Sequence, residues 1–185
     1  MLKGLEKKFN FSIPDDELEK YVSMEEDRVI AKLERDAKPC VGCNEELEKL
    51  SKSKKYGMAV VSSSALRRVQ ASVNKVGQAK YFPPDHIFSA ATSLDKPTTK
   101  PDPAIYLHAC KVIGKDPGEC VAVEDSKSGT LSAVRAGIPT IGYVGSYGGA
   151  EKQKEMFGVL KDLGCKNVMY NWSEFDKLLA EVEAM

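Results

Sequence analysis

The chain has no excess of charge of either sign. Its 185 residues include 27 Lys and Arg and 27 Asp and Glu, so the net charge is near zero. Proteins that bind nucleic acids or anionic membranes usually carry a marked basic excess, and a balanced composition gives no sign of one. We therefore expect neither a nucleic acid nor a membrane as the main partner.

Long apolar segments are absent as well. No run approaches the roughly 18 apolar residues that cross a bilayer, and the charged residues 1–6 lack the apolar core of a signal peptide. Five cysteines, an odd number in a chain of this length, do not indicate a disulfide framework. These absences predict a cytoplasmic protein with free thiols, built as one domain with at most a small appendage.

Strand signals are missing before Tyr56. Residues 15–38 carry apolar residues at helical spacing among many charges, with acids in the first turn, which predicts a helix. Pro39 ends that pattern, because the residue before a proline disfavours the helical conformation.

From Tyr56 onward, short apolar runs alternate with helical patterns. The runs predict strands at 56–61, 87–89, 121–123, 140–144 and 167–170. The segments between and after them predict helices at 65–76, 103–113, 128–136, 151–163 and 173–182, the last capped by Ser173. This order predicts a doubly wound α/β fold with a parallel sheet, in which ligands bind beyond the carboxyl ends of the strands.

The most informative pair is Glu124 and Asp125, at the end of the strand 121–123. Two adjacent carboxylates repel each other, and burial adds a desolvation cost, so a positive partner is expected there. Mg²⁺ is the simplest such partner, because it is bound through carboxylate and phosphate oxygens. The alternative is a strand end with solvated acids, or Asp125 as the N-cap of the next helix.

Two further segments supply groups that bind phosphate. Ser62, followed by Ser63 and Ser64, ends the first strand, and its hydroxyl with the following amides could hold an oxyanion at a helix N-terminus. Lys100 lies in the proline-rich segment 99–103, where restricted backbone would aim its side chain. The alternatives are turn residues for the serines and a surface lysine in a loop.

Together these residues resemble the haloacid dehalogenase (HAD) superfamily, in the branch of small phosphatases and β-phosphoglucomutase. Ser62 matches the hydroxyl that binds the transferred phosphoryl group, and Lys100 matches the lysine that neutralises it. Glu124 and Asp125 match the acids that bind Mg²⁺. The resemblance implies a Rossmannoid core and a small phosphorylated metabolite, such as a sugar phosphate, as substrate.

The first motif of that family, Asp-x-Asp-Gly-Thr with the nucleophilic aspartate, has no match in this sequence. The resemblance implies that residues 1–38 are part of a helical cap and that residues 39–185 are a core without its first strand. In the family that strand lies between the strands that end here at Ser62 and Glu124. Three outcomes are open: the two strands pair directly, a partner chain supplies the missing strand, or the polypeptide is a truncated product.

Two functions follow from this resemblance. The first is a HAD-type phosphatase or phosphomutase that forms an aspartyl-phosphate with Mg²⁺, inactive alone because the nucleophile is absent and Mg²⁺ binding is weakened. The second is a non-catalytic domain that binds a phosphate compound or a protein. A receiver-like signalling domain is a third interpretation, but the order hydroxyl, lysine, acids runs against it.

The remaining motifs are assigned structural roles. Cys40 and Cys43 form a single CxxC without a second pair or a neighbouring histidine, which argues against zinc. The glycine-rich segment 142–149 lacks the GxGxxG spacing and is expected to be a loop at the rim of the site. His86 and His108 are isolated, and we expect them to be structural.

Overall fold

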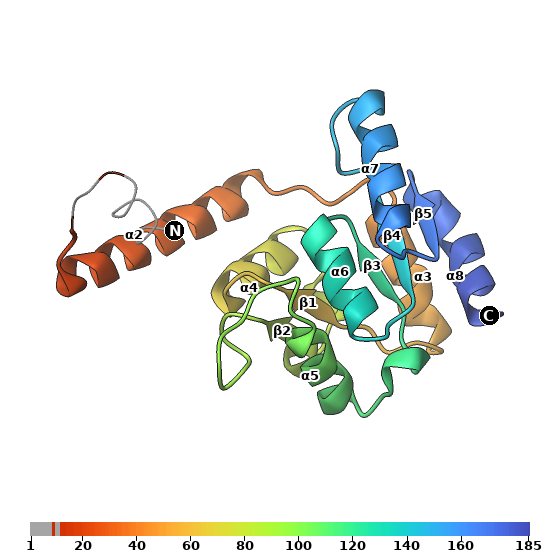
Figure 1. Cartoon of the computed structure of the whole chain (residues 1–185), viewed down its shortest axis with the longest axis horizontal. Helices are drawn as coiled ribbons and strands as arrows, with labels where there is room; N and C mark the ends of the chain where they lie inside the picture. Colours follow the sequence, from red (N-terminus) through yellow and green to blue (C-terminus); the bar gives the residue numbers. More distant parts are fainter. Residues whose placement is uncertain (1–8, 10–11) are drawn as a thin grey trace.

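The structure is a computed structural model that describes residue 9 and residues 12–185. Its strands are β1 (Val60–Ser62), β2 (Ile87–Ser89), β3 (Ala122–Glu124), β4 (Thr140–Tyr143) and β5 (Asn167–Met169). Its helices over residues 12–185 are α2 (Asp15–Asp36), α3 (Cys43–Ser53), α4 (Leu66–Lys75), α5 (Ala104–Ile113), α6 (Lys127–Arg135), α7 (Ala150–Asp162) and α8 (Phe175–Glu183). The alternation of strands and helices confirms the predicted α/β class (Figure 1).

The strands form two parallel sheets. β1 pairs with β2, with Val61 opposite Phe88, and β3, β4 and β5 form the second sheet in that order. Among the strands of the described residues, β1 does not pair with β3. The chain therefore does not close the expected gap by direct pairing, which was one of the three outcomes left open by the sequence.

Helices join the two sheets into one layered structure. α5 packs against β1 and β2, α6 packs against β3 and β4, and the two helices contact each other. One apolar cluster includes Phe88 of β2, Ile105 of α5, Ala122 of β3 and Ala133 of α6. Because this cluster crosses from one sheet to the other, hydrophobic burial holds the sheets together without strand pairing.

Helix α2 extends away from the strands and meets the rest of the molecule at α4 (Figure 1). Ion pairs join the two helices: Arg67 lies 3.2 Å from Asp27, and Arg68 lies 3.8 Å from Glu25. The part of the predicted cap at residues 1–8, 10 and 11 lies outside the described residues. The division into a cap and a core at residue 38 stays a prediction.

Some local expectations were wrong. The helix α3 was not predicted, although Gly42 in the left-handed conformation precedes it (φ 83°) and acids occupy its first turn. Ser173 does not cap the last helix. Instead Asn171 and Glu174 form a capping box around a short 3₁₀ turn, Trp172–Glu174, and α8 follows directly. The expected strand 56–61 is shorter, since only residues 60–62 form ladder hydrogen bonds.

Over the described part of the chain, no helix has both the length and the apolar character needed to cross a bilayer.

Candidate functional site

Lys100 connects the two sheets. It lies in the loop between β2 and α5, and its Nζ donates a hydrogen bond to the carbonyl oxygen of Val61 in β1 (2.9 Å). The same ammonium pairs with Oε1 of Glu124, the last residue of β3. Only 8% of the Lys100 side chain and 9% of the Glu124 side chain are exposed. The predicted convergence of the lysine and the first acid is therefore present in the structure.

Tyr106 completes this cluster from α5. Its hydroxyl donates to Oε1 of Glu124, and the Lys100 ammonium lies 3.5 Å from that hydroxyl and 4.7 Å from the ring centroid. Burial and the nearby Glu124 charge raise the pKa of Tyr106. Tyr106 was not predicted from the sequence, because an aromatic residue on an apolar helix face has the pattern of an ordinary core residue.

The first turn of α6 forms the other wall around Glu124. A Cβ atom at Gly129 would lie 1.8 Å from Oε2 of Glu124, so only glycine leaves room for this carboxylate. Ser126 caps α6, with its Oγ accepting from the Gly129 amide at 3.0 Å. The positive end of the helix dipole thus lies beside the carboxylate and stabilises its charge.

The serines after β1 hold the lysine loop. Ser63 Oγ accepts a hydrogen bond from the Lys100 amide (3.1 Å), and Ser62 Oγ accepts from the Ser64 amide (3.1 Å). The carbonyl of Ser64 in turn accepts from the buried Ser89 hydroxyl (2.7 Å). Ser62 also directly follows Val61, whose carbonyl binds Lys100. The carboxyl ends of β1 and β2 and the lysine loop therefore form one hydrogen-bonded unit.

Asp125 faces the solvent and a different set of partners. Its Oδ2 accepts from the Ser146 hydroxyl at 3.3 Å, and its backbone carbonyl accepts from the Tyr147 hydroxyl at 2.8 Å. Both partners belong to the glycine-rich loop, which therefore contacts the site as expected. Burial and the charge of Asp125 raise the pKa of Tyr147. The N-cap of α6 is Ser126, so the alternative role of Asp125 as that cap was wrong.

The two acids differ in what they offer to a cation. Oε1 of Glu124 already meets Lys100 and Tyr106, whereas the exposed carboxylate of Asp125 provides the oxygen ligand that Mg²⁺ prefers. Within residues 12–185 and residue 9, no group of three or more His, Cys, Asp or Glu side chains is placed to hold a metal ion. The exposed carboxylate of Asp125 fits one ligand position of a hard cation.

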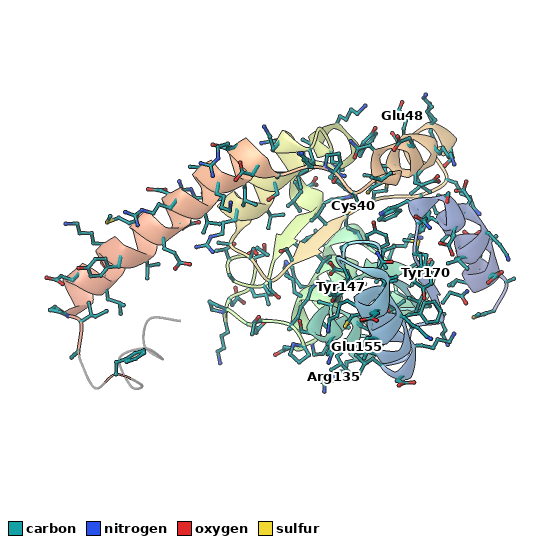
Figure 2. The ribbon with its side chains drawn as sticks, turned by 90° about the horizontal axis from the view of Figure 1, so that it is seen from above. Cys40, Glu48, Arg135, Tyr147, Glu155 and Tyr170 are labelled. Atoms are coloured by element: carbon teal, nitrogen blue, oxygen red, sulfur yellow. The ribbon has the colours of Figure 1, made fainter. Side chains whose placement is uncertain are left out.

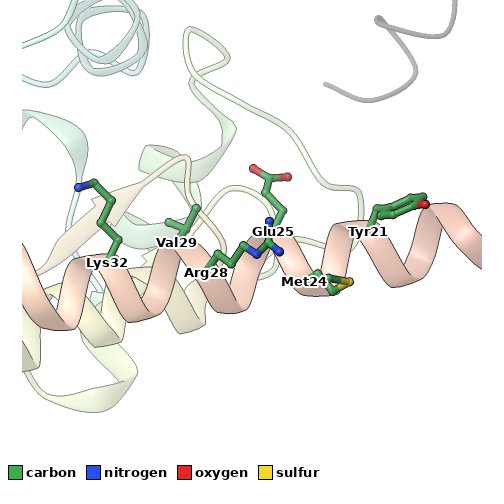
Figure 3. A pocket seen from close by; sticks show the side chains of 6 residues that line it. All are labelled: Tyr21, Met24, Glu25, Arg28, Val29 and Lys32. Atoms are coloured by element: carbon green, nitrogen blue, oxygen red, sulfur yellow. The ribbon is translucent and has the colours of Figure 1, made fainter.

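Two surface hollows lie apart from this cluster. One, of about 420 Å³, runs along α2 and is lined by residues that include Tyr21, Met24 and Arg28 (Figure 3). The other, of about 460 Å³, lies beside the α2–α3 linker and is lined by residues that include Cys40 and Tyr170 (Figure 2). Neither of these hollows is lined by the predicted site residues.

The CxxC segment forms a turn at the start of α3. The Cys43 amide donates to the Cys40 carbonyl at 3.1 Å, the Cys40 side chain is exposed, and Cys43 is buried. Burial raises the pKa of the Cys43 thiol to about 11. A thiol with this pKa is a weak nucleophile at neutral pH.

The alternating strands and helices, with the charged cluster beyond the strand ends, define an α/β protein built on parallel sheets. The sequence profile of the haloacid dehalogenase-like hydrolases matches residues 3–143. The chain therefore belongs to the haloacid dehalogenase-like hydrolase family, as the resemblance implied.

Several curated relatives are named as phosphatases. The chain is 37% identical to 6-phosphogluconate phosphatase of Escherichia coli (strain K12) over 81 residues, which are 44% of this chain and 35% of that protein. It is 34% identical to phosphoglycolate phosphatase of Psychrobacter arcticus over 103 residues, which are 55% of this chain and 41% of that protein. The matched regions thus span less than half of these relatives.

Solved structures share the fold over nearly the whole chain. A family IA, variant 3 HAD hydrolase from Entamoeba histolytica superposes with a TM-score of 0.75 at 26% identity, covering 97% of this chain and 77% of that one. A HAD family hydrolase from Deinococcus radiodurans, with bound phosphate and sodium, gives a TM-score of 0.70 at 25% identity, covering 98% of this chain and 74% of that one. About a quarter of each of these two chains therefore lies outside the part that matches.

Proposed function

We propose that this chain provides the phosphate-binding part of a phosphatase or phosphomutase that acts on a small phosphate ester. The observation that carries the proposal is the buried Lys100–Glu124 pair at the carboxyl ends of β1 and β3. The names of the curated relatives, 6-phosphogluconate phosphatase and phosphoglycolate phosphatase, support a small phosphorylated metabolite as substrate.

Each predicted site residue takes a defined role. The Lys100 ammonium would neutralise the phosphoryl oxygens, and the Ser62 hydroxyl would donate to one of them, with Ser63 holding the lysine loop in place. In the structure the ammonium already contacts Val61, Tyr106 and Glu124. Since an ammonium has three N–H groups, phosphate must replace one of these contacts.

Asp125 would hold Mg²⁺, which supplies positive charge against the transferring phosphoryl group. Glu124 was also predicted to bind the metal, and it would do so only after exchanging its contact with Lys100 or by using Oε2. The loop residues Ser146 and Tyr147 orient Asp125 through its carboxylate and its carbonyl.

The nucleophile would come from a strand that this sequence does not contain, carried by a partner chain or by a longer form of the polypeptide. Among the described strands, β1 pairs with β2 alone and β3 pairs with β4 alone, so each has one free edge. A strand parallel to both could therefore add to these edges. An aspartate at its carboxyl end would form a bond to phosphorus as the ester P–O bond breaks, and the alcohol would leave with a proton from a second acid.

A complementation assay tests this function. The chain is assayed with a generic phosphate ester and Mg²⁺, alone and after co-expression with the N-terminal segment of a phosphatase relative that carries Asp-x-Asp-Gly-Thr. We expect turnover only in the complemented sample, and we expect Asp125→Ala to abolish it while the exposed control Asp85→Ala does not. Turnover by the chain alone that disappears in Asp125→Ala would contradict the expected dependence on a partner.

The alternative is a non-catalytic phosphate-binding or protein-interaction domain. Binding of inorganic phosphate, measured by ³¹P NMR together with the turnover assay, distinguishes the non-catalytic domain from the enzyme. Phosphate binding that Lys100→Met weakens, together with no turnover in any complemented sample, would favour the non-catalytic domain over the enzyme.

A further inference from the structure

We propose that Tyr106 is a positioning residue that holds Lys100 and Glu124 at the strand ends, where the proposed function places phosphate. The inference rests on the proposed function, because it concerns the lysine assigned there to the phosphoryl group. It adds a residue to the site that the sequence patterns did not indicate.

The position of Tyr106 in the fold suits this role. Tyr106 is 7% exposed and lies in the first turn of α5, the helix that packs against β1, β2 and α6. Its hydroxyl reaches Glu124 at the tip of β3, and its ring lies beneath the Lys100 ammonium. One side chain on a well-packed helix therefore contacts both members of the ion pair, which come from two different segments.

Gly129 leaves just enough space for the Glu124 carboxylate. The carboxylate lies between the Tyr106 hydroxyl on one side and the backbone of Gly129 on the other, where even a methyl group would collide with it. A carboxylate confined in this way cannot rotate away from Lys100 without losing the phenol donor. Tyr106 and Gly129 together thus restrict Glu124, and Glu124 restricts Lys100.

Within the described residues, a trio of lysine, tyrosine and glutamate with an exposed lysine occurs twice more. Tyr81 donates to Glu48 at 2.7 Å with Lys80 4.7 Å from its ring, and Tyr56 donates to Glu183 at 2.7 Å with Lys55 4.8 Å from its ring. In those trios the lysine side chains are 64% and 61% exposed, whereas Lys100 is 8% exposed. Water can replace a lost phenol at the exposed bond between Tyr56 and Glu183, but the buried trio of Lys100, Tyr106 and Glu124 is shielded from water.

Removal of the Tyr106 hydroxyl should therefore release Lys100. Glu124 would lose one of its two donors in a place where solvent does not readily substitute. The carboxylate and the ammonium would then sample other positions, and the lysine would become accessible to reagents in solution.

The experiment measures the acylation rate of each lysine by mass spectrometry in the wild-type chain and in Tyr106→Phe. We expect the rate at Lys100 to rise about tenfold, the factor that corresponds to the loss of one hydrogen bond to a charged group. The rates at Lys55 and Lys80 should stay unchanged in that variant. The matched control, Tyr56→Phe, should change the rate at Lys55 by less than about threefold, because an exposed ion pair contributes little.

An unchanged Lys100 rate in folded Tyr106→Phe would overturn the inference. If that variant does not fold, Gly129→Ala provides the second test: its methyl group displaces the Glu124 carboxylate while the phenol stays, and the Lys100 rate should rise as well. An unchanged Lys100 rate in Gly129→Ala would show that Glu124 does not restrain Lys100. The role of Tyr106, which acts through Glu124, would then be wrong as well.

The same samples separate this inference from the proposed function. If Lys100 is released in Tyr106→Phe and inorganic phosphate binds more weakly by ³¹P NMR, both stand. If Lys100 is released but phosphate binding does not change, Tyr106 positions the lysine and the phosphate role of Lys100 is wrong.

Discussion

Lys100 and Glu124 form an ion pair across the boundary between the two sheets, although 24 residues separate them in the chain. A buried pair has a high desolvation cost, and it is maintained only where further hydrogen bonds satisfy both groups. Here Val61 accepts from the ammonium and Tyr106 donates to the carboxylate. The pair therefore depends on residues from β1, β3, the lysine loop and α5 at once.

Loss of the lysine should strongly destabilise the fold. Lys100→Met leaves Glu124 as an unpaired buried charge, and we expect the free energy of unfolding to fall by about 3–5 kcal/mol in denaturant titrations. The control is Lys152→Met, which removes an exposed pair with Glu155 (2.7 Å) and should cost at most about 1 kcal/mol. If both variants lose the same small amount of stability, the pair does not hold the sheets together.

Gly129→Ala should destabilise the chain because the new methyl group meets the Glu124 carboxylate. We expect a loss of about 1–3 kcal/mol, as for other overpacked sites. Gly158→Ala is the matched control in α7, since its added carbon meets nothing within 4 Å. That variant should gain up to about 1 kcal/mol from helix propensity. Thermal and denaturant unfolding would compare the stabilities of the two variants. If Gly129→Ala is as stable as the wild type, the predicted collision with Glu124 is wrong.

Ser126→Ala removes the side-chain cap of α6 beside the site. We expect a loss of about 1 kcal/mol in the free energy of unfolding, the usual cost of an N-cap. Ser51→Ala, at an exposed helical position in α3, should change stability by less than about 0.5 kcal/mol. Equal losses in the two variants would show that the cap is not needed.

Alkaline pH should weaken the fold partly through Cys43. Its folded pKa of about 11 lies above its ordinary value of 9.0, so the unfolded chain releases this proton first. The contribution of the buried Cys43 thiol to the free energy of unfolding is therefore fully present below about pH 9 and is lost as the pH rises through about 11. Cys43→Ala should show a shallower fall of the unfolding free energy between these values than the wild type. Parallel curves would contradict the raised pKa.

Much of the fold could be predicted because strand and helix patterns are local. The apolar runs before Ser62 and Glu124 identified the strand ends. Because functional residues gather beyond the carboxyl ends of parallel strands, Lys100 and Glu124 were expected to lie near each other. The match to the haloacid dehalogenase-like profile bears out the family resemblance. The helix α3 was missed because no side chain caps its start. The cap near the last helix was misplaced by two residues, because Ser173 and Asn171 are both acceptable capping residues and Asn171 caps the 3₁₀ turn before α8.

The sequence by itself determined the α/β class, the family and the residues that follow each strand, because these depend on spacing along the chain and on residue type. Only the tertiary structure decided that β1 and β3, among the described strands, do not pair with each other and that Lys100 bridges them. It also decided that Asp125 faces a different set of partners from Glu124. It also revealed Tyr106 and Gly129, whose importance lies in the position of a carboxylate that folding brings between them. Contacts of this kind depend on how helices and strands pack, which local sequence patterns do not specify.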